Sequence, residues 1–298
     1  MRHTWALTRI RILLSLRNKT FMFFGVVMPL AFLFFFVFIF GGGKSDRIAY
    51  VLGSILTITV MGSFWGLSVQ LVMFREQGIL RRFRLAPVGA GALLASSILS
   101  NYVLILPPIA IEILICRFAF HMTSWGNLWY VFLLVTIGAG TFSSFGLIVA
   151  SVTNTMQETQ VINNLIWSGF LFLSGATVPL AVLPRWIQRV CLFSPATYMA
   201  TGLERSMTLQ ALPNEILVDV IALAIGLFVS FEISRQLFRW EPEAKVSRSA
   251  KLWVVAAMIP FLVFGIYENV YSNRLSNIRQ GFGNLFGGDA PAQGPARN

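Results

Sequence analysis

The sequence predicts an all-α protein that crosses a membrane several times. Of its 298 residues, 56% are hydrophobic and only 12% are charged, whereas about 25% of the residues of a typical soluble domain carry a charge. The apolar residues also gather in uncharged runs, several of them long enough to span a bilayer as helices. The net charge of +11 would suggest nucleic acid in a soluble protein, but cytoplasmic loops and lipid headgroups account for it here.

The N-terminal residues predict a cytoplasmic segment followed by a first membrane span. Residues 1–19 hold five basic side chains and no acidic one, and residues 21–40 form an uncharged run of twenty. The apolar core of a signal peptide is about 7–15 residues long, so this longer, Phe-rich run is expected to stay in the chain. Lys and Arg collect on the cytoplasmic side of membrane proteins, which places the N-terminus inside the cell.

Later uncharged runs predict the spans that follow. Residues 48–74 and 85–111 predict the second and third spans, and the run from 118 to 157 predicts a turn and a fourth span that ends near Val152. The fifth span is expected to open near Gln160, and residues 220–231 form the short core of the sixth. Small residues in the fourth span predict a face for close helix packing: Gly138, Gly140, Ser143, Ser144 and Gly146.

Residues 41–45, Gly-Gly-Gly-Lys-Ser, are similar to the end of a phosphate-binding loop, but they predict a short external turn. Phe38 stands where that pattern has its first glycine, and a membrane span replaces the strand that should precede it. We therefore expect no ATP site and no cofactor in this chain. His3 and His121 are isolated in the sequence, so a His-based metal centre is not expected either.

Polar residues inside the predicted spans are candidate sites: Asn101, Glu112, Asn163 and Asn164. Buried amides can line a substrate path or bridge helices, and bridging is the commoner use. An intramembrane acid is a functional candidate by default; the alternative, which we favour, is a Glu112 carboxylate that snorkels near Arg117. Cys116 and Cys191 are expected to be inert thiols, although a bridge between them is conceivable.

Residues 75–87 combine positive charge with an apolar strip. They read Arg-Glu-Gln-Gly-Ile-Leu-Arg-Arg-Phe-Arg-Leu-Ala-Pro. On a helix, Ile79, Leu80 and Phe83 share one side, because residues three and four apart are neighbours, and Pro87 ends that helix. A loop that only kept positive charge in the cytoplasm would not need such a strip. The pattern therefore favours a segment that docks on a partner.

Residues 174–205 lie between two apolar runs and are broken by three prolines and two glycines. Proline lacks the N–H and clashes with the preceding turn, so this stretch cannot form one continuous helix. In lipid, broken backbone survives only where protein covers it or where it lines a watery cavity. We expect short helical pieces at the membrane face, where Arg185, Trp186 and Arg189 suit the interface.

Both stretches resemble the membrane subunits of type V ABC exporters, the family of bacterial drug- and polysaccharide-export permeases. The resemblance covers about residues 1–240. It implies an N-terminal elbow helix at 1–19 and a six-helix permease domain at 20–240 with a re-entrant external loop. In this family the segment between the second and third helices is a coupling helix seated in a groove of the ATPase subunit.

The resemblance also implies two sets of site residues. The residues expected to couple to the ATPase are Arg75, Glu76, Gly78, Ile79, Leu80, Arg81, Arg82, Phe83, Arg84 and Pro87. The residues expected to form the external gate motif are Ser174, Gly175, Pro179, Pro184, Trp186, Pro195, Tyr198, Gly202 and Arg205.

The chain departs from the family beyond Glu241. Residues 241–272 are expected to form a linker and a seventh membrane helix, although the uncharged run 252–267 is shorter than the roughly 20 residues that a span needs. It could instead be re-entrant. The tail 273–298 is rich in Gly, Asn and Ala and is expected to be disordered.

The sequence thus predicts a transport subunit that is not itself an enzyme, in the bacterial inner membrane with its N-terminus in the cytoplasm. The expected partners are two copies of an ABC ATPase, which would hold ATP and Mg, a second permease copy or paralogue, and membrane lipids, with no nucleic acid. Aromatic and aliphatic walls favour an amphipathic drug-like or lipid-like cargo. The alternatives are export of a polysaccharide or lipid-linked glycan, and an ion-coupled secondary transporter, which would need repeats and midplane ion sites.

Overall fold

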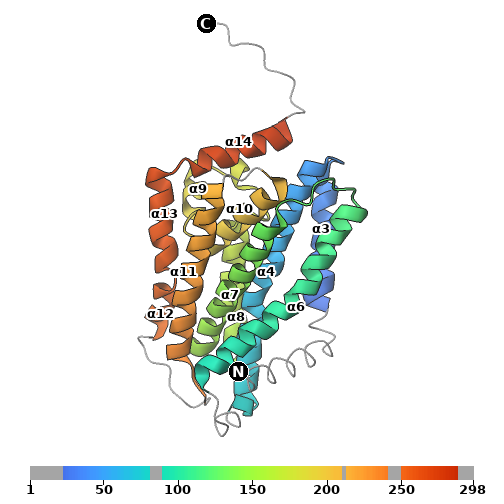
Figure 1. The fold of residues 1–298 in the computed structure, drawn as a ribbon. Coiled ribbons are helices and arrows are strands. Elements are labelled where there is room, and N and C mark those ends of the chain that lie inside the picture. The colour runs from blue at the N-terminus through green and yellow to red at the C-terminus, as the bar shows by residue number, and fades with distance from the viewer. Residues whose placement is uncertain (1–22, 81–88, 210–212, 241–249, 288–298) are drawn as a thin grey trace, which may run out of the picture.

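The computed structural model describes residues 23–80, 89–209, 213–240 and 250–287, and these residues form helices and connecting turns without a strand (Figure 1). The predicted elbow at 1–19 lies outside them. The first apolar run forms η1 (Phe23–Val27), α3 (Met28–Phe36) and η2 (Val37–Gly41). The long helices that follow are α4 (Ser45–Glu76), α6 (Ala90–Phe118), α7 (Leu128–Val152), α8 (Met156–Leu173) and α11 (Pro213–Leu237).

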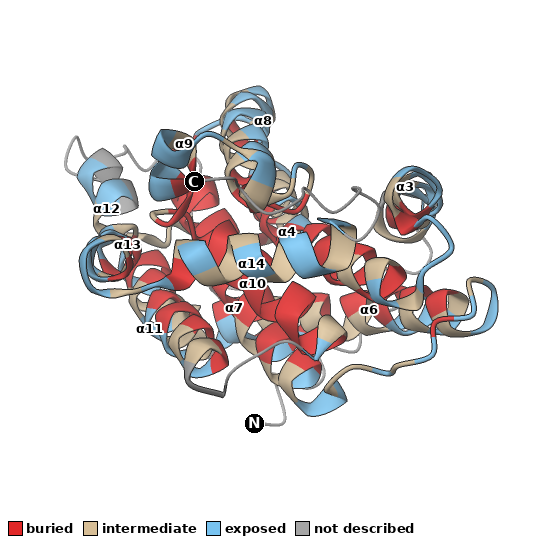
Figure 2. Ribbon diagram, turned by 90° about the horizontal axis from the view of Figure 1, so that it is seen from above, coloured by how far each residue is buried: buried red, intermediate tan, exposed pale blue. Residues whose placement is uncertain are grey.

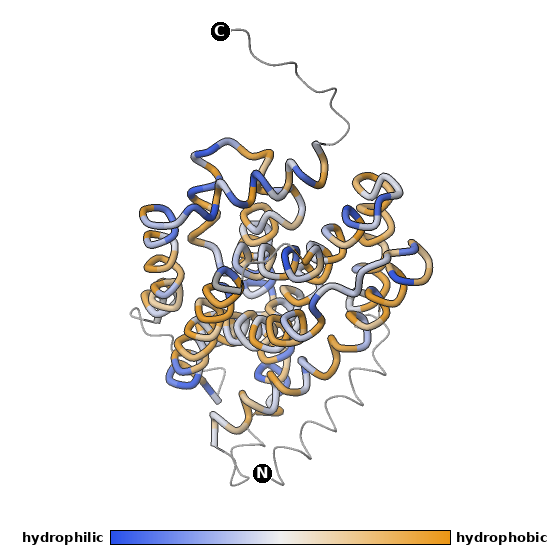
Figure 3. The backbone as a smooth tube through the Cα atoms, turned by 45° about the horizontal axis from the view of Figure 1, so that its top comes forward, coloured by the Kyte–Doolittle hydropathy of each residue, from blue (hydrophilic) through white to orange (hydrophobic). Residues whose placement is uncertain are grey.

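Four of the helices in the described residues are long and apolar enough to cross a membrane, namely α4, α6, α7 and α11. Their apolar residues continue along most of their length (Figure 3). The run 25–41 is a shorter apolar helix, and α8 carries Glu158 and Asn163 in its first half. The predicted second, third, fourth and sixth spans thus correspond to these four helices, and the sixth extends well beyond its short uncharged core. The expected seventh membrane helix is divided instead into two short helices, Ala250–Ala256 and Ile259–Tyr271.

Helix α7 lies at the centre of the bundle, where α4, α10 and α11 pack around it. The predicted small-residue face makes this possible. A Cβ atom on Gly146 would lie 2.2 Å from the Phe64 carbonyl oxygen of α4, and one on Gly140 would lie 3.0 Å from the Leu227 side chain of α11. The α4 and α7 backbones therefore touch at Gly146, which confirms the predicted packing face.

The two ends of the bundle, as drawn in Figure 1, carry different elements. The lower end holds the end of α4, the start of α6 and the turn from α7 to α8. The upper end holds the short elements η3 (Leu180–Val182), α9 (Arg185–Cys191) and α10 (Pro195–Thr208). Residues 174–205 thus form the short helical pieces that their prolines and glycines predict.

The C-terminal extension runs up the side of the bundle and then across its upper end. Helices α12 (Ala250–Ala256) and α13 (Ile259–Tyr271) meet at a break just before Pro260. Phe261 of α13 packs on α11, where a Cβ on Gly226 would lie 2.3 Å from its ring. Helix α14 (Arg274–Phe286) then crosses above α10 (Figures 1 and 2).

Helix α14 corrects the expectation of a disordered tail from residue 273. Gly and Asn in this stretch suggested disorder by composition, but Ile278, Phe282 and Leu285 recur at helical spacing and all face the bundle, where they line one cavity. The spacing of the few apolar residues therefore outweighs the polar composition. Residues 288–298 lie outside the described part of the chain.

Candidate coupling and gate sites

The described part of the coupling stretch is anchored in the bundle at the lower end. Helix α4 ends at Glu76, and Gly78 turns the chain with a φ of 69°. Leu80 is fully buried in a small core formed with leucines of α4, α6 and α7, including Leu67 and Leu93. Four residues of the predicted coupling set and its terminal proline fall outside the described residues: Arg81, Arg82, Phe83, Arg84 and Pro87.

Arg75 is also turned inward, against the end of α7. Its Nη1 donates to the Ala150 carbonyl at 2.9 Å and its Nη2 to the Thr153 carbonyl at 2.6 Å. The last carbonyls of a helix lack partners within it, and a cation at this end is stabilised by the helix dipole. Arg75 thus satisfies the end of α7 while linking it to α4.

Arg239, which follows α11, bonds to the same end of α7. Its Nε donates to the Ser151 carbonyl at 2.9 Å and its Nη2 to the Thr153 carbonyl at 2.7 Å. Burial lowers the pKa of the Arg239 guanidinium, and the Glu158 carboxylate opposes this effect. We call Arg75 and Arg239 the arginine pair. Arg239 is not among the predicted site residues, because the pairing of segments far apart in the chain cannot be read from the sequence.

Glu76 links α4 to the next helix. Its Oε1 accepts from the Met156 N–H, at the first turn of α8, at 2.7 Å. An acidic side chain is favoured at a helix N-terminus. Thr155 caps the same turn by accepting from the Glu158 N–H at 3.2 Å. Together with Arg75, Glu76 fixes the end of α4 to the α7–α8 turn.

The buried amides bridge helices. Asn101 of α6 donates to Ser143 Oγ of α7 at 3.3 Å, and Asn163 of α8 donates to Ser68 Oγ of α4 at 2.5 Å. Asn164 is exposed. The predicted bridging use is therefore found at Asn101 and Asn163.

Glu112 does not snorkel, which corrects the expectation we favoured. Its side chain is fully buried, and its Oε1 accepts from Thr59 Oγ1 of α4 at 2.7 Å. Arg117 instead donates to the backbone carbonyls of Met122 and Thr123. The carboxyl group therefore bridges α6 and α4. The two cysteines are buried and free, so no bridge joins Cys116 to Cys191.

At the upper end, the predicted gate residues determine the course of the backbone between α8 and α10. Ser174 Oγ accepts from the Ala176 N–H at 3.0 Å, and Gly175 has a φ of 88°, a left-handed conformation that favours glycine. Pro179 and Pro184 immediately precede η3 and α9. Trp186 of α9 is 68% exposed. Sequence analysis missed Gln188, whose Nε2 donates to the Leu180 carbonyl at 2.6 Å and ties α9 back to η3.

Helix α10 carries the rest of the motif in the interior of the upper end. Pro195 occupies its first turn, and Tyr198 is buried and donates to the Leu192 carbonyl at 2.8 Å. A Cβ on Gly202 would lie 3.0 Å from Leu134, so α10 lies close to α7. Arg205 pairs with Glu215 at 2.6 Å.

Glu204 belongs to this site although the sequence did not single it out. A Cβ on Gly53 of α4 would lie 2.6 Å from the Glu204 Cα, so the two backbones are in contact. The Glu204 Oε1 also accepts from Ser54 Oγ at 2.7 Å. Its position between Gly202 and Arg205 of the predicted gate motif was the available signal, but the buried Ser54 partner could not be predicted from it.

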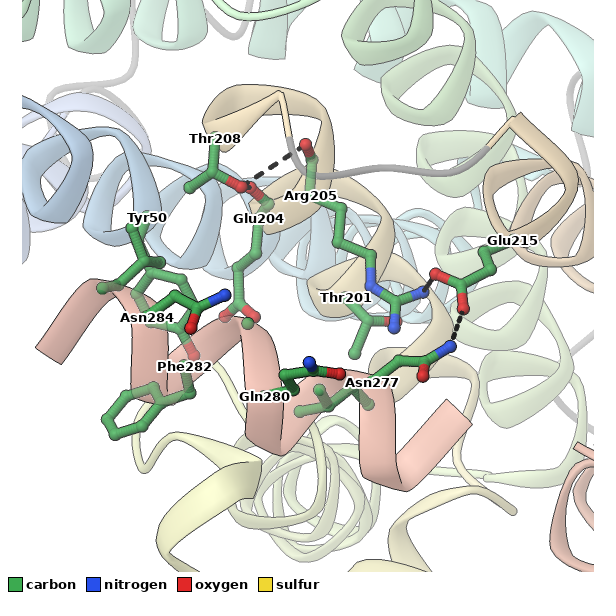
Figure 4. Close-up of a pocket in the computed structure, with 13 residues that line it drawn as sticks. Tyr50, Thr201, Glu204, Arg205, Thr208, Glu215, Asn277, Gln280, Phe282 and Asn284 are labelled. Atoms are coloured by element: carbon green, nitrogen blue, oxygen red, sulfur yellow. Dashed lines mark hydrogen bonds and ion pairs between the residues drawn. The ribbon is translucent and has the colours of Figure 1, made fainter. Parts of the chain in front are cut away.

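A cavity of about 350 Å³ lies between α10 and α14. Figure 4 shows Glu204 and Arg205 reaching toward it from α10, Tyr50 from α4, and Asn277 and Phe282 from α14. Arg205 is paired with Glu215, and Glu215 also accepts from Asn277 at 2.6 Å. Helix α10, which carries part of the predicted gate motif, is therefore covered by α14, with the cavity between them.

Comparisons with known proteins identify a family and several similar permeases. The family model described as ABC-2 type transporter matches residues 2–208. The putative transport permease YvfS of Bacillus subtilis (strain 168) is 25% identical over 197 residues, which cover 63% of this chain and 78% of that protein.

Two resistance proteins are also similar to this chain. The daunorubicin resistance ABC transporter permease protein DrrB1 of Streptomyces coeruleorubidus is 27% identical over 189 residues, 59% of this chain and 65% of DrrB1. The linearmycin resistance permease protein LnrN of B. subtilis (strain 168) is 25% identical over 177 residues, 59% of this chain and 46% of LnrN. The aligned regions thus span less than two thirds of both resistance proteins, and the family match ends before α11.

Proposed function

The chain belongs to the ABC-2 type transporter family, and from this premise we propose that it is the permease subunit of an ATP-driven exporter for amphipathic drug-like or lipid-like molecules. The family and the apolar helices make it a multi-pass membrane subunit of an ABC transporter. The export direction, the cargo and the coupling to a separate ATPase are the proposal. The distribution of Lys and Arg favours a cytoplasmic N-terminus in a bacterial inner membrane.

The network around Arg75 carries this proposal. ABC permeases work with ATPase subunits, and energy from a separate subunit must reach the helices through a cytoplasmic contact. Residues 75–87 are proposed to be that contact. Arg75 and Leu80 are buried in this chain, so the contact falls to the exposed Glu76 and to Phe83 with the basic residues around it. A push on them would be passed by Arg75 to α7 and by Glu76 to α8.

The upper end supports the proposed exit for cargo. Packed helices shift as units between discrete arrangements, so a movement of α7 at the lower end would be transmitted to α10, which packs on it. We propose that two ATPase copies drive two permeases, identical or paralogous, that face each other. The α10 region would open in response and release cargo outside the cell.

Two further observations favour a drug exporter over the alternative functions. The relatives LnrN and DrrB1 are named for resistance to linearmycin and to daunorubicin, which favours a drug-like cargo over a glycan. The bond between Glu112 Oε1 and Thr59 gives this carboxyl group a structural use between α6 and α4, so an ion-carrying role is not needed to explain it.

The test begins by purifying the tagged chain from its host and measuring which proteins accompany it. We expect a stoichiometric ATPase that is lost in Phe83→Asp and retained in Trp186→Asp, which places the same charge on an exposed residue at the opposite end. Reconstituted complex is then assayed for ATP turnover with daunorubicin, linearmycin or a lipid-linked glycan. Ion-driven uptake by the chain without an ATPase would refute the proposal. Stimulation of ATP turnover by the glycan alone would show that the cargo is a glycan and not a drug-like or lipid-like molecule.

A further inference from the structure

Helix α14 is anchored at its first residue by a buried arginine. Arg274 is 2% exposed, pairs with Asp219 of α11 and donates to Thr201 Oγ1 of α10. Its guanidinium also lies 5.0 Å from the centre of the Tyr198 ring. Burial alone would lower the pKa of Arg274, but the carboxylates of Asp219 and Glu268 raise it above the ordinary arginine value. This one side chain ties the extension to α10 and to α11.

The other end of α14 is held by α4 through weaker contacts. Arg47 Nε donates to the Leu285 carbonyl at 3.0 Å, and its guanidinium lies 5.1 Å from the centre of the Phe286 ring. Tyr50 makes edge contacts with Phe282 at 6.0 Å and with Phe286 at 5.7 Å between ring centres. These side chains are only partly buried.

Helix α14 therefore joins α11 and α10 to α4 from above, over the cavity (Figures 2 and 4). Beneath it, α10 touches α4 at Gly53 and Glu204. Any movement that separates α10 from α4 must stretch or release α14. The Arg274 end is the firm one, because breaking it would leave buried carboxylates without their counter-charge. The Arg47 end exchanges its contacts for water more readily.

We propose that α14 is a latch that holds the outer gate closed, fixed to α10 and α11 by Arg274 and released from α4 at Arg47 and Tyr50. Arg274 is thus a positioning residue for the gate. The proposal rests on the proposed function, since it assumes that cargo leaves between α4 and α10. It concerns a segment beyond the family match, which ends at residue 208.

The first test measures access to the cavity without nucleotide. A single cysteine is placed at Thr208, which lines the cavity, in a chain whose Cys116 and Cys191 are alanine. A membrane-impermeant maleimide is added to sealed vesicles of either orientation. We expect slow labelling, accelerated about tenfold or more by Phe282→Ala with Phe286→Ala, because both ring contacts with Tyr50 are lost. Phe228→Ala, a matched aromatic truncation at a 74% exposed position of α11, should leave the rate unchanged.

This test separates the latch from the proposed function. Equal labelling rates with and without the two phenylalanines would overturn the latch, whether or not an ATPase accompanies the chain. Accelerated labelling that occurs only from the cytoplasmic side would support the latch and overturn the proposed orientation.

The second test locks the latch in the complete complex with a bis-methanethiosulfonate cross-linker, whose spacer replaces the long side chains that the cysteine substitutions remove and whose bonds to the cysteines are reducible. Arg47→Cys with Leu285→Cys joins α14 to α4, and we expect it to abolish drug-stimulated ATP turnover until a reductant is added. Glu215→Cys with Asn277→Cys is the control, since it joins α14 to α11 and leaves α4 free. Full turnover in the cross-linked first pair, or equal loss in both pairs, would contradict the latch.

Discussion

Replacing Arg75 by alanine tests whether the arginine pair holds the lower end together. The change removes two hydrogen bonds from a charged donor to the Ala150 and Thr153 carbonyls, each worth about 1.5–3 kcal/mol. Part of this is recovered, because a buried cation no longer has to be kept out of water. The Thr153 carbonyl also keeps its bond from Arg239 at 2.7 Å.

We therefore expect Arg75→Ala to lower the free energy of unfolding by about 2–4 kcal/mol. For a chain of 298 residues, with an unfolding entropy of about 2.1 cal/mol/K per residue, this corresponds to a fall in Tm of about 3–6 °C. Arg75→Lys should lie between alanine and the native residue, since an ammonium group lacks the planar fork that reaches two carbonyls.

The assay is thermal unfolding of the detergent-purified complex, followed by tryptophan fluorescence, together with ATP turnover. Drug stimulation of turnover should fall in Arg75→Ala while basal turnover remains, because the push on residues 75–87 no longer reaches α7. Arg235→Ala is the control, since this arginine is at the same end but its side chain is 53% exposed and paired with Glu232; such pairs contribute about 0–1 kcal/mol. If Arg75→Ala and Arg235→Ala have the same Tm, the end of α7 does not depend on Arg75 and the reasoning is wrong.

Substitutions at Gly146 and at Glu112 test the contacts between the long helices. Gly146→Ala should destabilise the chain by about 1–3 kcal/mol, because its Cβ would meet the Phe64 carbonyl, whereas Gly169→Ala, with open space around it, should be neutral or stabilising; thermal melts of the two proteins give the comparison. Glu112→Gln should keep the bond from Thr59 and full ATP-dependent export, while Glu112→Ala should lose about 1–3 kcal/mol by leaving that hydroxyl unpaired. Loss of export in a stable Glu112→Gln protein would show that the carboxyl group carries an ion after all.

Hydropathy and small-residue spacing were enough to locate the long helices and the packing face of α7. Helical spans have few alternatives in lipid, so uncharged runs at 48–74 and 85–111 correspond closely to α4 and α6. The prolines and glycine at 175–195 likewise predicted the break into η3, α9 and α10, because each of these residues determines the backbone conformation at its own position.

The side-chain partners could not be predicted in the same way. Glu112 was assigned to Arg117, five residues away in the sequence, but it contacts Thr59 on another helix. Arg75 was counted among the residues that meet a partner, yet its guanidinium is bonded within the chain. Whether a polar side chain of a helix faces its neighbours or the outside depends on the rotation of that helix, and the sequence around one residue does not determine it.

The route of α12 and α13 has a practical consequence for labelling this protein. By climbing the side of the bundle, they bring α14 to the end opposite Glu76 (Figure 1). With the N-terminus in the cytoplasm, as proposed, this end faces outward. A reporter enzyme that matures only in the periplasm, fused after α14, should then be active, whereas the same enzyme fused after α11 should remain silent. An affinity handle at the carboxyl terminus would likewise be reached by antibodies on intact spheroplasts, and it would stay clear of any nucleotide-hydrolysing subunit during purification.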